Sequence, residues 1–425
     1  MEFEKIQSKS LGEVLYRGVH KSGLKIYVLQ KNGFSKSYAS FAARVGSVDS
    51  EFTVPGESEK TKVPDGIAHF LEHKLFEQPD GSNVFEKYSK TGAWANAFTG
   101  FNTTAYIFSA TGGFYENLEI LLDFVSKPYF TDENVAKEQG IIGQEIRMYD
   151  DDPNWRVFFN LLSAMYVSHP VKKDIAGTVE SISRINKDIL YKCYNTFYNP
   201  SNMILFACGD VDCKRVEQLA DKYVTASPIG EINRHYPEEP PRINQSVSEQ
   251  RLSVALPIFL LGFKDSELKQ RGGDMLRKQI TTEVLLEMLA GKSSPLYNTL
   301  YEKGLINDSF ELDFSSETDY AHTVMGGEST DPEAARAIIL KQMREAKLLP
   351  DDFQRCKKVL IGRFLRLFNS VENVSNTFVS NIFKGIDIFE YPQICEQITL
   401  KEAQDRKESH FTEENCAMSV VRPFG

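Results

Sequence analysis

Two histidines and a glutamate lie close together in the stretch His69-Phe70-Leu71-Glu72-His73. On a helix, residues four apart lie one turn above each other, so the imidazoles of His69 and His73 share a face and Glu72 projects from nearly the same face. Two neutral imidazoles can hold one Zn²⁺ while a carboxylate stands beside the open position of the metal. This arrangement suits hydrolysis. The alternative is a helix whose polar stripe carries two histidines without a metal.

A third ligand is needed, because catalytic zinc sites usually have three protein ligands. The stretch 132–148 predicts a second helix, since its apolar residues recur at helical spacing and form a core face. Glu138 and Glu145 are seven residues apart in this stretch, so they share a face two turns apart. Taken singly, each glutamate is more simply interpreted as part of a solvated helix surface.

The order His-x-x-Glu-His is the reverse of the commoner zinc-protease signature and is the inverzincin motif. Three features stand in this order along the chain: the motif at 69–73, the stretch 92–99 (GAWANAFT) followed by Tyr106, and the pair Glu138 and Glu145. Through them the chain resembles the pitrilysin and insulysin family of zinc metallopeptidases. Within this family it especially resembles the half-length members that are similar to the mitochondrial processing peptidase. A looser similarity extends over most of the chain.

The resemblance implies a role for each of these residues. In the family, the two motif histidines and the second glutamate of the pair bind zinc, which here implies His69, His73 and Glu145. The glutamate inside the motif, here Glu72, is the general base. The first glutamate of the pair, here Glu138, supports a metal ligand.

The expected activity is that of a zinc endopeptidase, in which Glu72 takes a proton from a zinc-bound water and passes it to the leaving amine. The strand through Asn96, Ala97 and Phe98 resembles the family's substrate edge, where an extended peptide adds as an extra strand. Because that mode depends on the peptide backbone more than on side chains, we expect unfolded peptides or exposed segments as substrates. Zinc is the expected cofactor, although a set of two histidines and a glutamate also accepts Co²⁺ or Mn²⁺.

The length and composition of the chain indicate a globular protein and exclude some classes of partner. A chain of 425 residues is too long for one ordinary core, and its 41% hydrophobic and 25% charged residues are typical of a globular protein. The net charge of −10 and the lack of a basic stretch argue against a nucleic-acid partner. The six cysteines form no C-x-x-C pair, the N-terminal stretch has no apolar segment, and the apolar run 254–263 is too short to cross a bilayer. We therefore expect a cytoplasmic protein without a membrane partner.

The sequence divides almost in half. Residues 229–250 are rich in Pro and Glu and poor in apolar residues, which indicates a linker. It would separate an N-terminal catalytic, zinc-binding domain at 1–228 from a C-terminal homologous domain at 251–425. The predicted fold is α+β: two homologous domains, each a mostly antiparallel sheet with helices packed on one face, together forming a clamshell.

The second half repeats the first in outline but lacks the chemistry. When Val135 is set against Phe353, the two glutamates of the first half fall on Cys356 and Arg363. The region that matches the motif helix, 282–288, contains no histidine. The second domain is therefore expected to keep the fold without a metal site, and to serve packing and substrate enclosure.

One departure from the family bears on partners. The family's substrate-binding Arg and Tyr are expected near Leu305, but Tyr301 stands where the Arg belongs, and Asn307 or Asp308 where the Tyr belongs. Half-length members often work as dimers in which an inactive partner supplies that pair, so we expect a homo- or heterodimer with a homologous subunit. Two alternatives remain: a non-catalytic structural subunit of a peptidase-like complex, and a peptide-maturation protease active only in a heterodimer.

Overall fold

A computed structural model describes residues 1–424 of the chain and shows two compact units. Unit 1 consists of Met1–Ile146, Asp174–His235 and Arg366–Phe383, and unit 2 of Arg147–Lys173, Tyr236–Leu365 and Lys384–Gly425. The units are therefore not contiguous in sequence, unlike the predicted domains 1–228 and 251–425. Segments 147–173 and 366–383 each belong to the unit formed mainly by the other half of the chain.

Unit 1 is built on a seven-stranded sheet in which only one neighbouring pair, β3 and β9, runs parallel. In spatial order its strands are β1 (Glu4–Ser8), β2 (Glu13–Val19), β3 (Lys25–Gln30), β9 (Met203–Gly209), β4 (Ser37–Ala43), β8 (Thr104–Ala110) and β7 (Trp94–Thr99). A small second sheet has the order β10 (Asn233–Arg234), β5 (Glu51–Thr53), β6 (Lys60–Lys62). The mostly antiparallel sheet expected from the sequence is confirmed.

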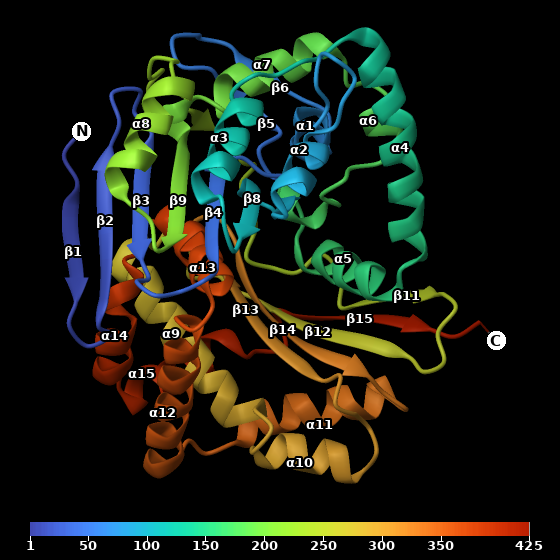
Figure 1. Ribbon diagram of the computed structural model, residues 1–425. Coiled ribbons are helices and arrows are strands. Elements are labelled where there is room, and N and C mark those ends of the chain that lie inside the picture. The colour runs from blue at the N-terminus through green and yellow to red at the C-terminus, as the bar shows by residue number, and fades with distance from the viewer. Residues whose placement is uncertain (425) are drawn as a thin grey trace. The chain divides into compact units, whose positions relative to one another are not determined.

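Helices surround the sheet of unit 1, and some of them pack directly on it (Figure 1). They are α1 (Ile67–Leu75), α2 (Val84–Thr91), α3 (Phe114–Val125), α4 (Asp132–Asp151, in unit 2 from Arg147 on), α6 (Val179–Ile182), α7 (Lys187–Phe197), α8 (Cys213–Tyr223), α13 (Val371–Ile382) and the 3₁₀ turn η2 (Pro200–Asn202). On β4, Phe41 pairs with Tyr106, whose ring lies 5.7 Å from that of Phe124 on α3. Tyr38 points to the opposite face and donates a hydrogen bond to Asn376 on α13. Because both faces are covered here, β4, β8 and β9 are buried along nearly their whole length.

Unit 2 contains a five-stranded sheet with the order β11 (Val247–Arg251), β15 (Cys416–Arg422), β12 (Ile258–Lys264), β14 (Ala321–Glu328), β13 (Glu311–Ser316). Its helices are α5 (Pro153–Met165), α9 (Gly272–Ala290), α10 (Pro295–Glu302), α11 (Pro332–Glu345), α12 (Pro350–Leu367, in unit 1 from Arg366 on), α14 (Tyr391–Gln397) and α15 (Leu400–His410), with the 3₁₀ turns η1 (Pro170–Lys172) and η3 (Ile388–Glu390). Strand β12 begins at Ile258, inside the apolar run 254–263, because the preceding Pro257 has no N–H for the ladder.

The two sheets repeat one topology. The order β11-β15-β12-β14-β13 matches β3-β9-β4-β8-β7, and in each the first pair is parallel and the others antiparallel. The burial of α4 and α12 also repeats: Val135 and Glu138 are buried in one, and Phe353 and Cys356 at the matching places in the other. The predicted internal repeat is confirmed.

One helix from each half packs on the sheet of the other half. Helix α5 lies on β12 and β15, and α13 lies on β4 and β9. The approach of α5 is so close that a Cβ at Gly262 would lie 2.5 Å from the sulfur of Met165. In unit 1, Phe378 of α13 stacks on Phe206 with ring centroids 5.2 Å apart.

The segment 229–250, predicted as a linker, is attached to the fold at several points. Its residues form β10 and most of β11. Arg234 pairs with the buried Asp49 at 3.0 Å in unit 1. In unit 2 the buried Lys264 pairs with Glu239, which also accepts hydrogen bonds from the backbone N–H groups of 167–169.

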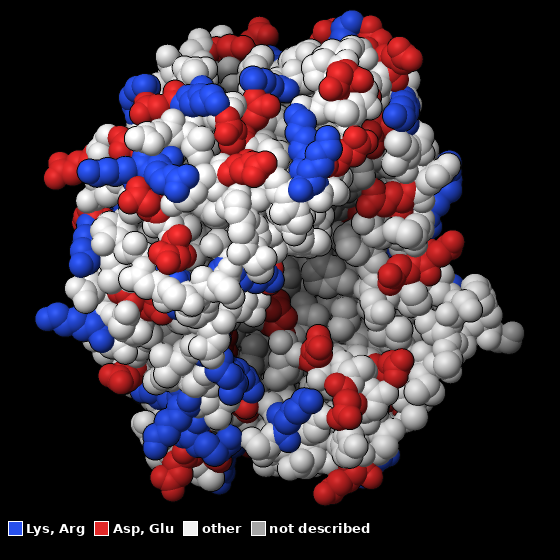
Figure 2. All heavy atoms as spheres, viewed as in Figure 1, with Lys and Arg blue, Asp and Glu red and all other residues white. Residues whose placement is uncertain are grey.

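Acidic and basic side chains are interspersed over most of the face that Figure 2 shows, and basic side chains gather at its lower left. This distribution agrees with the net charge of −10. All six cysteines are free. Among the described residues, no helix is both long and apolar enough to cross a membrane.

Candidate metal centre

Helix α1 carries the inverzincin motif and is buried along almost its whole length. It begins at Ile67, and Gly66 is the residue at its N-terminal end. Gly66 has φ 90°, and a Cβ there would lie 2.4 Å from the carbonyl oxygen of Ala176. Only glycine therefore fits this start. On the sheet side, the hydroxyl of Tyr106 contacts the carbonyl of Leu71 at 3.4 Å and fixes the helix over β8.

The three predicted ligands converge. One ligand atom from each of His69, His73 and Glu145 lies within 4.8 Å of the others. The carboxylate of Glu145 reaches both imidazoles, with 3.7 Å from Oε1 to Nε2 of His69 and 3.5 Å from Oε2 to Nε2 of His73. Tetrahedral zinc with bonds of 2.0–2.2 Å separates its ligand atoms by roughly 3.3–3.6 Å. The donor set therefore fits zinc, and the two distances from Glu145 to the imidazoles lie close to the range for zinc ligands.

Glu138 and Lys74 support His73 on the side of its imidazole away from Glu145. The imidazole Nδ1 of His73 lies 3.1 Å from Oε1 of Glu138, which leaves Nε2 facing Glu145. Lys74 is completely buried, and its ammonium lies 3.7 Å from Oε2 of Glu138, 3.2 Å from the carbonyl oxygen of Asn134 and in direct contact with Glu77. This chain of charges holds one tautomer and one ring orientation of His73.

Helix α4 is fixed to its surroundings before it reaches the site. At its start, Thr131 and Asn134 exchange side-chain to backbone hydrogen bonds of 3.1 and 2.9 Å. One turn later the amide of Gln139 donates to the carbonyl oxygens of Ile182, Ser183 and Ile185. These contacts set the position from which Glu145 reaches α1.

Glu72 is buried beside the three converging residues. Its Oε2 accepts a hydrogen bond of 2.6 Å from the hydroxyl of Thr99, the last residue of β7. Burial raises the pKa of the Glu72 carboxyl, and the hydrogen bond from Thr99 and the charge of His73 offset only part of that rise. A buried carboxylate with a raised pKa is suited to accept a proton and then release it.

The two histidines titrate differently although they are one turn apart. Burial and the neighbouring His73 lower the pKa of His69 to about 4, so His69 is neutral at pH 7. Burial acts in the same direction on His73, but its hydrogen bond to Glu138 and the charge of Glu145 raise the pKa of His73 above its ordinary value. Burial alone would raise the pKa of Glu138, yet the bond to His73 and the charge of Lys74 bring it below its ordinary value. A metal that binds Nε2 of His73 therefore competes with a proton for that nitrogen.

The predicted substrate residues lie on β7, which is an edge strand of the seven-stranded sheet. Ala97 lies opposite Tyr106 on the face that packs against the helices. Asn96 and Phe98 alternate with it and point to the other face, where both are exposed. The outer N–H of Ala97 is bonded to Oδ1 of Asn96 at 2.9 Å.

Two residues of the site were not predicted. A lysine is usually exposed, so nothing in the sequence marked Lys74 as buried. Thr99 lies 27 residues from Glu72, and only its place at the end of the GAWANAFT stretch could have indicated it. His169 is also buried, and its Nδ1 accepts a hydrogen bond from the N–H of Val171 at 3.1 Å.

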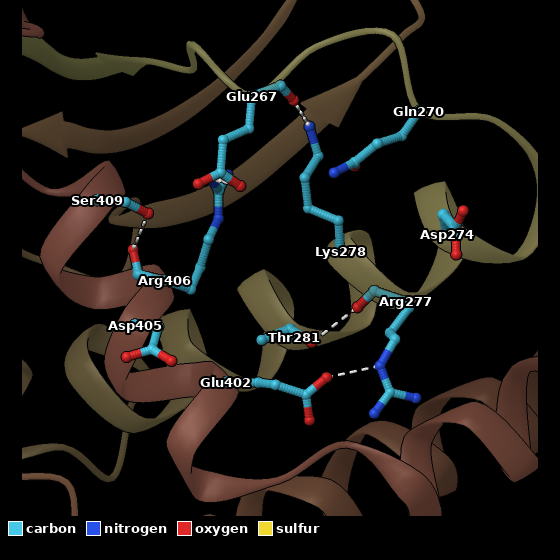
Figure 3. A pocket seen from close by; sticks show the side chains of 10 residues that line it. All are labelled: Glu267, Gln270, Asp274, Arg277, Lys278, Thr281, Glu402, Asp405, Arg406 and Ser409. Atoms are coloured by element: carbon cyan, nitrogen blue, oxygen red, sulfur yellow. Dashed lines mark hydrogen bonds and ion pairs between the residues drawn. The ribbon is translucent and has the colours of Figure 1, made fainter.

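Unit 2 contains a charged pocket of about 470 Å³ between α9, α15 and the loop before α9 (Figure 3). Its basic side chains are already engaged. Arg277 pairs with Glu402 at 2.6 Å, Lys278 donates to the carbonyl of Glu267 at 2.6 Å, and Arg406 pairs with the buried Asp265. These interactions neutralise the pocket internally, so the candidate site of this chain is the group around α1.

Comparison with known proteins gives the family. Residues 56–179 match the family profile "Insulinase (Peptidase family M16)" and residues 184–360 match "Peptidase M16 inactive domain". The chain is 43% identical to an uncharacterized zinc protease, YmfH, of Bacillus subtilis, over 98% of this chain and 99% of the relative. The chain belongs to peptidase family M16. The zinc protease PqqE of Helicobacter pylori is a more distant M16 relative, 23% identical over 84% of each chain.

Solved structures agree with the M16 assignment. A putative M16-like peptidase from Alicyclobacillus acidocaldarius superposes with a TM-score of 0.92 at 34% identity, covering 100% of this chain and 99% of that one. Pitrilysin superposes with a TM-score of 0.76 at 15% identity, covering 99% of this chain but 46% of pitrilysin, which shows a shared fold. This M16 chain therefore has the length of a half of pitrilysin, as expected for a half-length member. The match to the inactive-domain profile ends within the second half, which contains no motif histidine pair.

Proposed function

We propose that this M16 chain is a zinc-dependent endopeptidase that hydrolyses unfolded peptides or exposed segments of proteins. The observation that carries the proposal is the convergence of His69, His73 and Glu145 within 4.8 Å, on and beside a helix that also carries the buried Glu72. The names of the relatives, which are zinc proteases, support it.

In the proposed mechanism, zinc would be held by His69, His73 and Glu145. When bound, zinc polarises a scissile carbonyl and makes the attacking water more acidic. Glu72 accepts a proton from that water and then gives it to the leaving amine. Glu138 accepts the Nδ1–H of His73 and keeps its Nε2 directed at the metal position.

The proposed substrate lies along β7 as an additional strand. An edge strand offers unpaired backbone groups to an extended peptide. Because the N–H of Ala97 is bonded to Asn96 Oδ1, an incoming peptide carbonyl replaces that amide oxygen as the acceptor. The exposed side chains of Trp94 and Phe98 then lie along the same face as alternate residues of the peptide.

The test is cleavage of a quenched fluorescent peptide library by wild-type protein and by Glu72→Gln, with zinc measured in both. We expect cleavage by the wild type, a loss of about 100-fold or more in Glu72→Gln, and equal zinc content. A matched control is Glu133→Gln, which changes an exposed glutamate in the first turn of α4. Absence of both zinc and cleavage in the wild type would contradict the proposal and favour a non-catalytic structural subunit.

We also propose that the chain works as a homo- or heterodimer with a homologous subunit. The basis is the departure at Tyr301, which is 51% exposed and stacks on Tyr297, where the family resemblance leads one to expect an arginine. The test is light scattering of the purified chain, alone and with a homologous chain. Zinc-loaded protein that cleaves only after the partner is added would support a heterodimer, and a fully active monomer would refute the dimer.

A further inference from the structure

The hydroxyl of Thr99 connects the proposed substrate strand to the proposed general base. Thr99 ends β7, and its Oγ1 lies 2.6 Å from Oε2 of Glu72 on α1. Glu72 is buried, so the oxygen it presents to Thr99 is shielded from water. A hydrogen bond to a carboxylate of this length is a strong one, because the acceptor is charged.

The available protons fix the direction of this bond. A threonine hydroxyl has one proton to donate. Thr104, opposite Thr99 on β8, uses its proton on the carbonyl oxygen of Val45 at 3.0 Å. The two threonine hydroxyls are 3.4 Å apart, so the carboxylate oxygen at 2.6 Å is by far the better acceptor for Thr99. Thr99 therefore donates, and Oε2 of Glu72 is occupied as an acceptor.

We propose that Thr99 is a positioning residue that reserves Oε2 of Glu72, so that Oε1 is the oxygen that carries the proton during peptide hydrolysis. This inference rests on the proposed function. One O–H bond of the attacking water breaks as an Oε1–H bond forms and the water oxygen bonds to the scissile carbonyl carbon. The Oε1–H bond then breaks as an N–H bond forms on the leaving amine and the C–N bond of the peptide breaks. Glu72 returns to the carboxylate, with Oε2 bonded to Thr99 throughout.

The proposal couples substrate binding to the position of the base. Asn96, Ala97 and Phe98 stand directly before Thr99 on the same edge strand, which pairs with β8 along 94–99. A peptide that adds to β7 shifts or stiffens the strand that holds Glu72. Misplacing a catalytic group by about 1 Å can lower the rate roughly 100-fold. Loss of this single hydrogen bond to Glu72 is therefore expected to lower the rate of hydrolysis.

The first test compares Thr99→Val, which is nearly isosteric and lacks the hydroxyl, with Thr99→Ser, which restores it. We expect Thr99→Val to lower kcat by about 10-fold or more while KM and zinc content stay within about two-fold, and Thr99→Ser to recover most of kcat. The control is Thr196→Val, at a buried threonine whose hydroxyl donates to the Lys192 carbonyl of its own helix. Unchanged kcat in Thr99→Val, or loss of zinc in the same variant, would overturn the proposal.

The second test does not depend on activity. In a double-mutant cycle, Thr99→Val should lower the melting temperature more in the wild type than in a Glu72→Leu background, where the acceptor is gone. Equal drops in the two backgrounds would show that the bond is not formed, and would overturn the proposal even in an active enzyme. A wild type that cleaves no peptide but shows the coupling would overturn the proposed function, and the route of the proton with it.

Discussion

Each unit has a corresponding pair of helices beside its sheet, α1 and α4 in unit 1 and α9 and α12 in unit 2. The two pairs differ in the charges of their side chains. In unit 1, Nε2 of His73 on α1 faces Glu145 on α4 at 3.5 Å. At the corresponding place in unit 2, Glu287 on α9 pairs with Arg363 on α12 at 2.7 Å. A guanidinium thus supplies, from the protein itself, the positive charge that a metal would supply in unit 1. The same backbone arrangement is therefore stable without a metal once an arginine neutralises the carboxylate.

The residues that support the metal ligands also differ between the units: they are charged in unit 1 and uncharged at the corresponding positions of unit 2. Where unit 1 has the buried Glu138, unit 2 has the buried Cys356. If Glu287 corresponds to His73, then Met288 corresponds to Lys74, which is completely buried. Burying an ion pair generally stabilises a fold no more than apolar residues of the same size do. The buried charges of unit 1 are thus not required by the fold, and their use lies in orienting His73.

Removal of a metal ligand from unit 1 should have the largest effect of the changes that test this difference between the two units. His73→Ala or Glu145→Gln leaves two of the three ligands, so we expect bound zinc to fall from about one per chain to near zero after dialysis, and cleavage to be lost with it. Metal content by mass spectrometry is the measurement. Glu287→Gln, the matched change in unit 2, should leave the zinc content as in the wild type. Zinc retained by Glu145→Gln would show that another residue is the third ligand.

Acid should have the second-largest effect, a loss of stability in unit 2. The reason is that the buried histidines of unit 2 form hydrogen bonds with uncharged groups. His322 bonds the hydroxyl of Tyr166, and burial lowers its pKa to about 4. Burial also lowers the pKa of His169 to about 4, against the opposing charge of Glu239. The unfolded chain, with histidine near 6.5, binds these protons more readily than the folded one. Stability is therefore complete above about pH 6.5 and falls toward pH 4, by on the order of 3 kcal/mol for each histidine.

Urea unfolding between pH 7.5 and 5, followed by the fluorescence of Trp155 in a Trp94→Phe background, measures this loss in unit 2. His169→Asn is the informative variant, because an asparagine oxygen can replace Nδ1 as the acceptor for the N–H of Val171 and does not titrate. It should reduce the dependence on pH. A free energy of unfolding that does not change over this range would contradict the burial argument.

The part of the site that could be predicted is the part set by local geometry. His69, Glu72 and His73 lie within one helical turn and a half, so their relative positions follow from the helix alone. Glu145 follows His73 by 72 residues, and only the resemblance to known peptidases connected it with the motif. The edge position of the strand through Asn96 likewise came from the resemblance.

The part that could not be predicted depends on contacts between distant segments. The exchange of α5 and α13 is not visible in the order of elements, because each helix has an apolar face that fits either sheet. Lys74 is followed by apolar residues and resembles any lysine at a helix end until α4 covers it. The bond from Thr99 to Glu72 requires β7 and α1 to be packed together first.

Replacing Lys74 by the residue of unit 2 should have an intermediate effect. Lys74→Met removes the cation beside Glu138, so that carboxylate is free to turn away from His73. We expect zinc to bind about 10- to 100-fold more weakly, the usual effect of losing a residue that supports a metal ligand. Competition with a chelator measures the affinity. Lys127→Met, which removes an exposed lysine paired with Asp123, is the control and should leave zinc binding unchanged. Equal affinity in Lys74→Met and the wild type would mean that Glu138 needs no cation.

The smallest effect is expected for the arginine that stands in place of the metal. Arg363→Met breaks the pair with Glu287, but the arginine side chain is 55% exposed, so solvent already weakens the interaction. The expected loss in the free energy of unfolding is about 1 kcal/mol or less, measured by the same Trp155 fluorescence, with zinc content and cleavage unchanged. If the variant instead lost cleavage while it kept zinc, Arg363 would have a role in binding peptide, and unit 2 would contribute to the reaction by more than its fold.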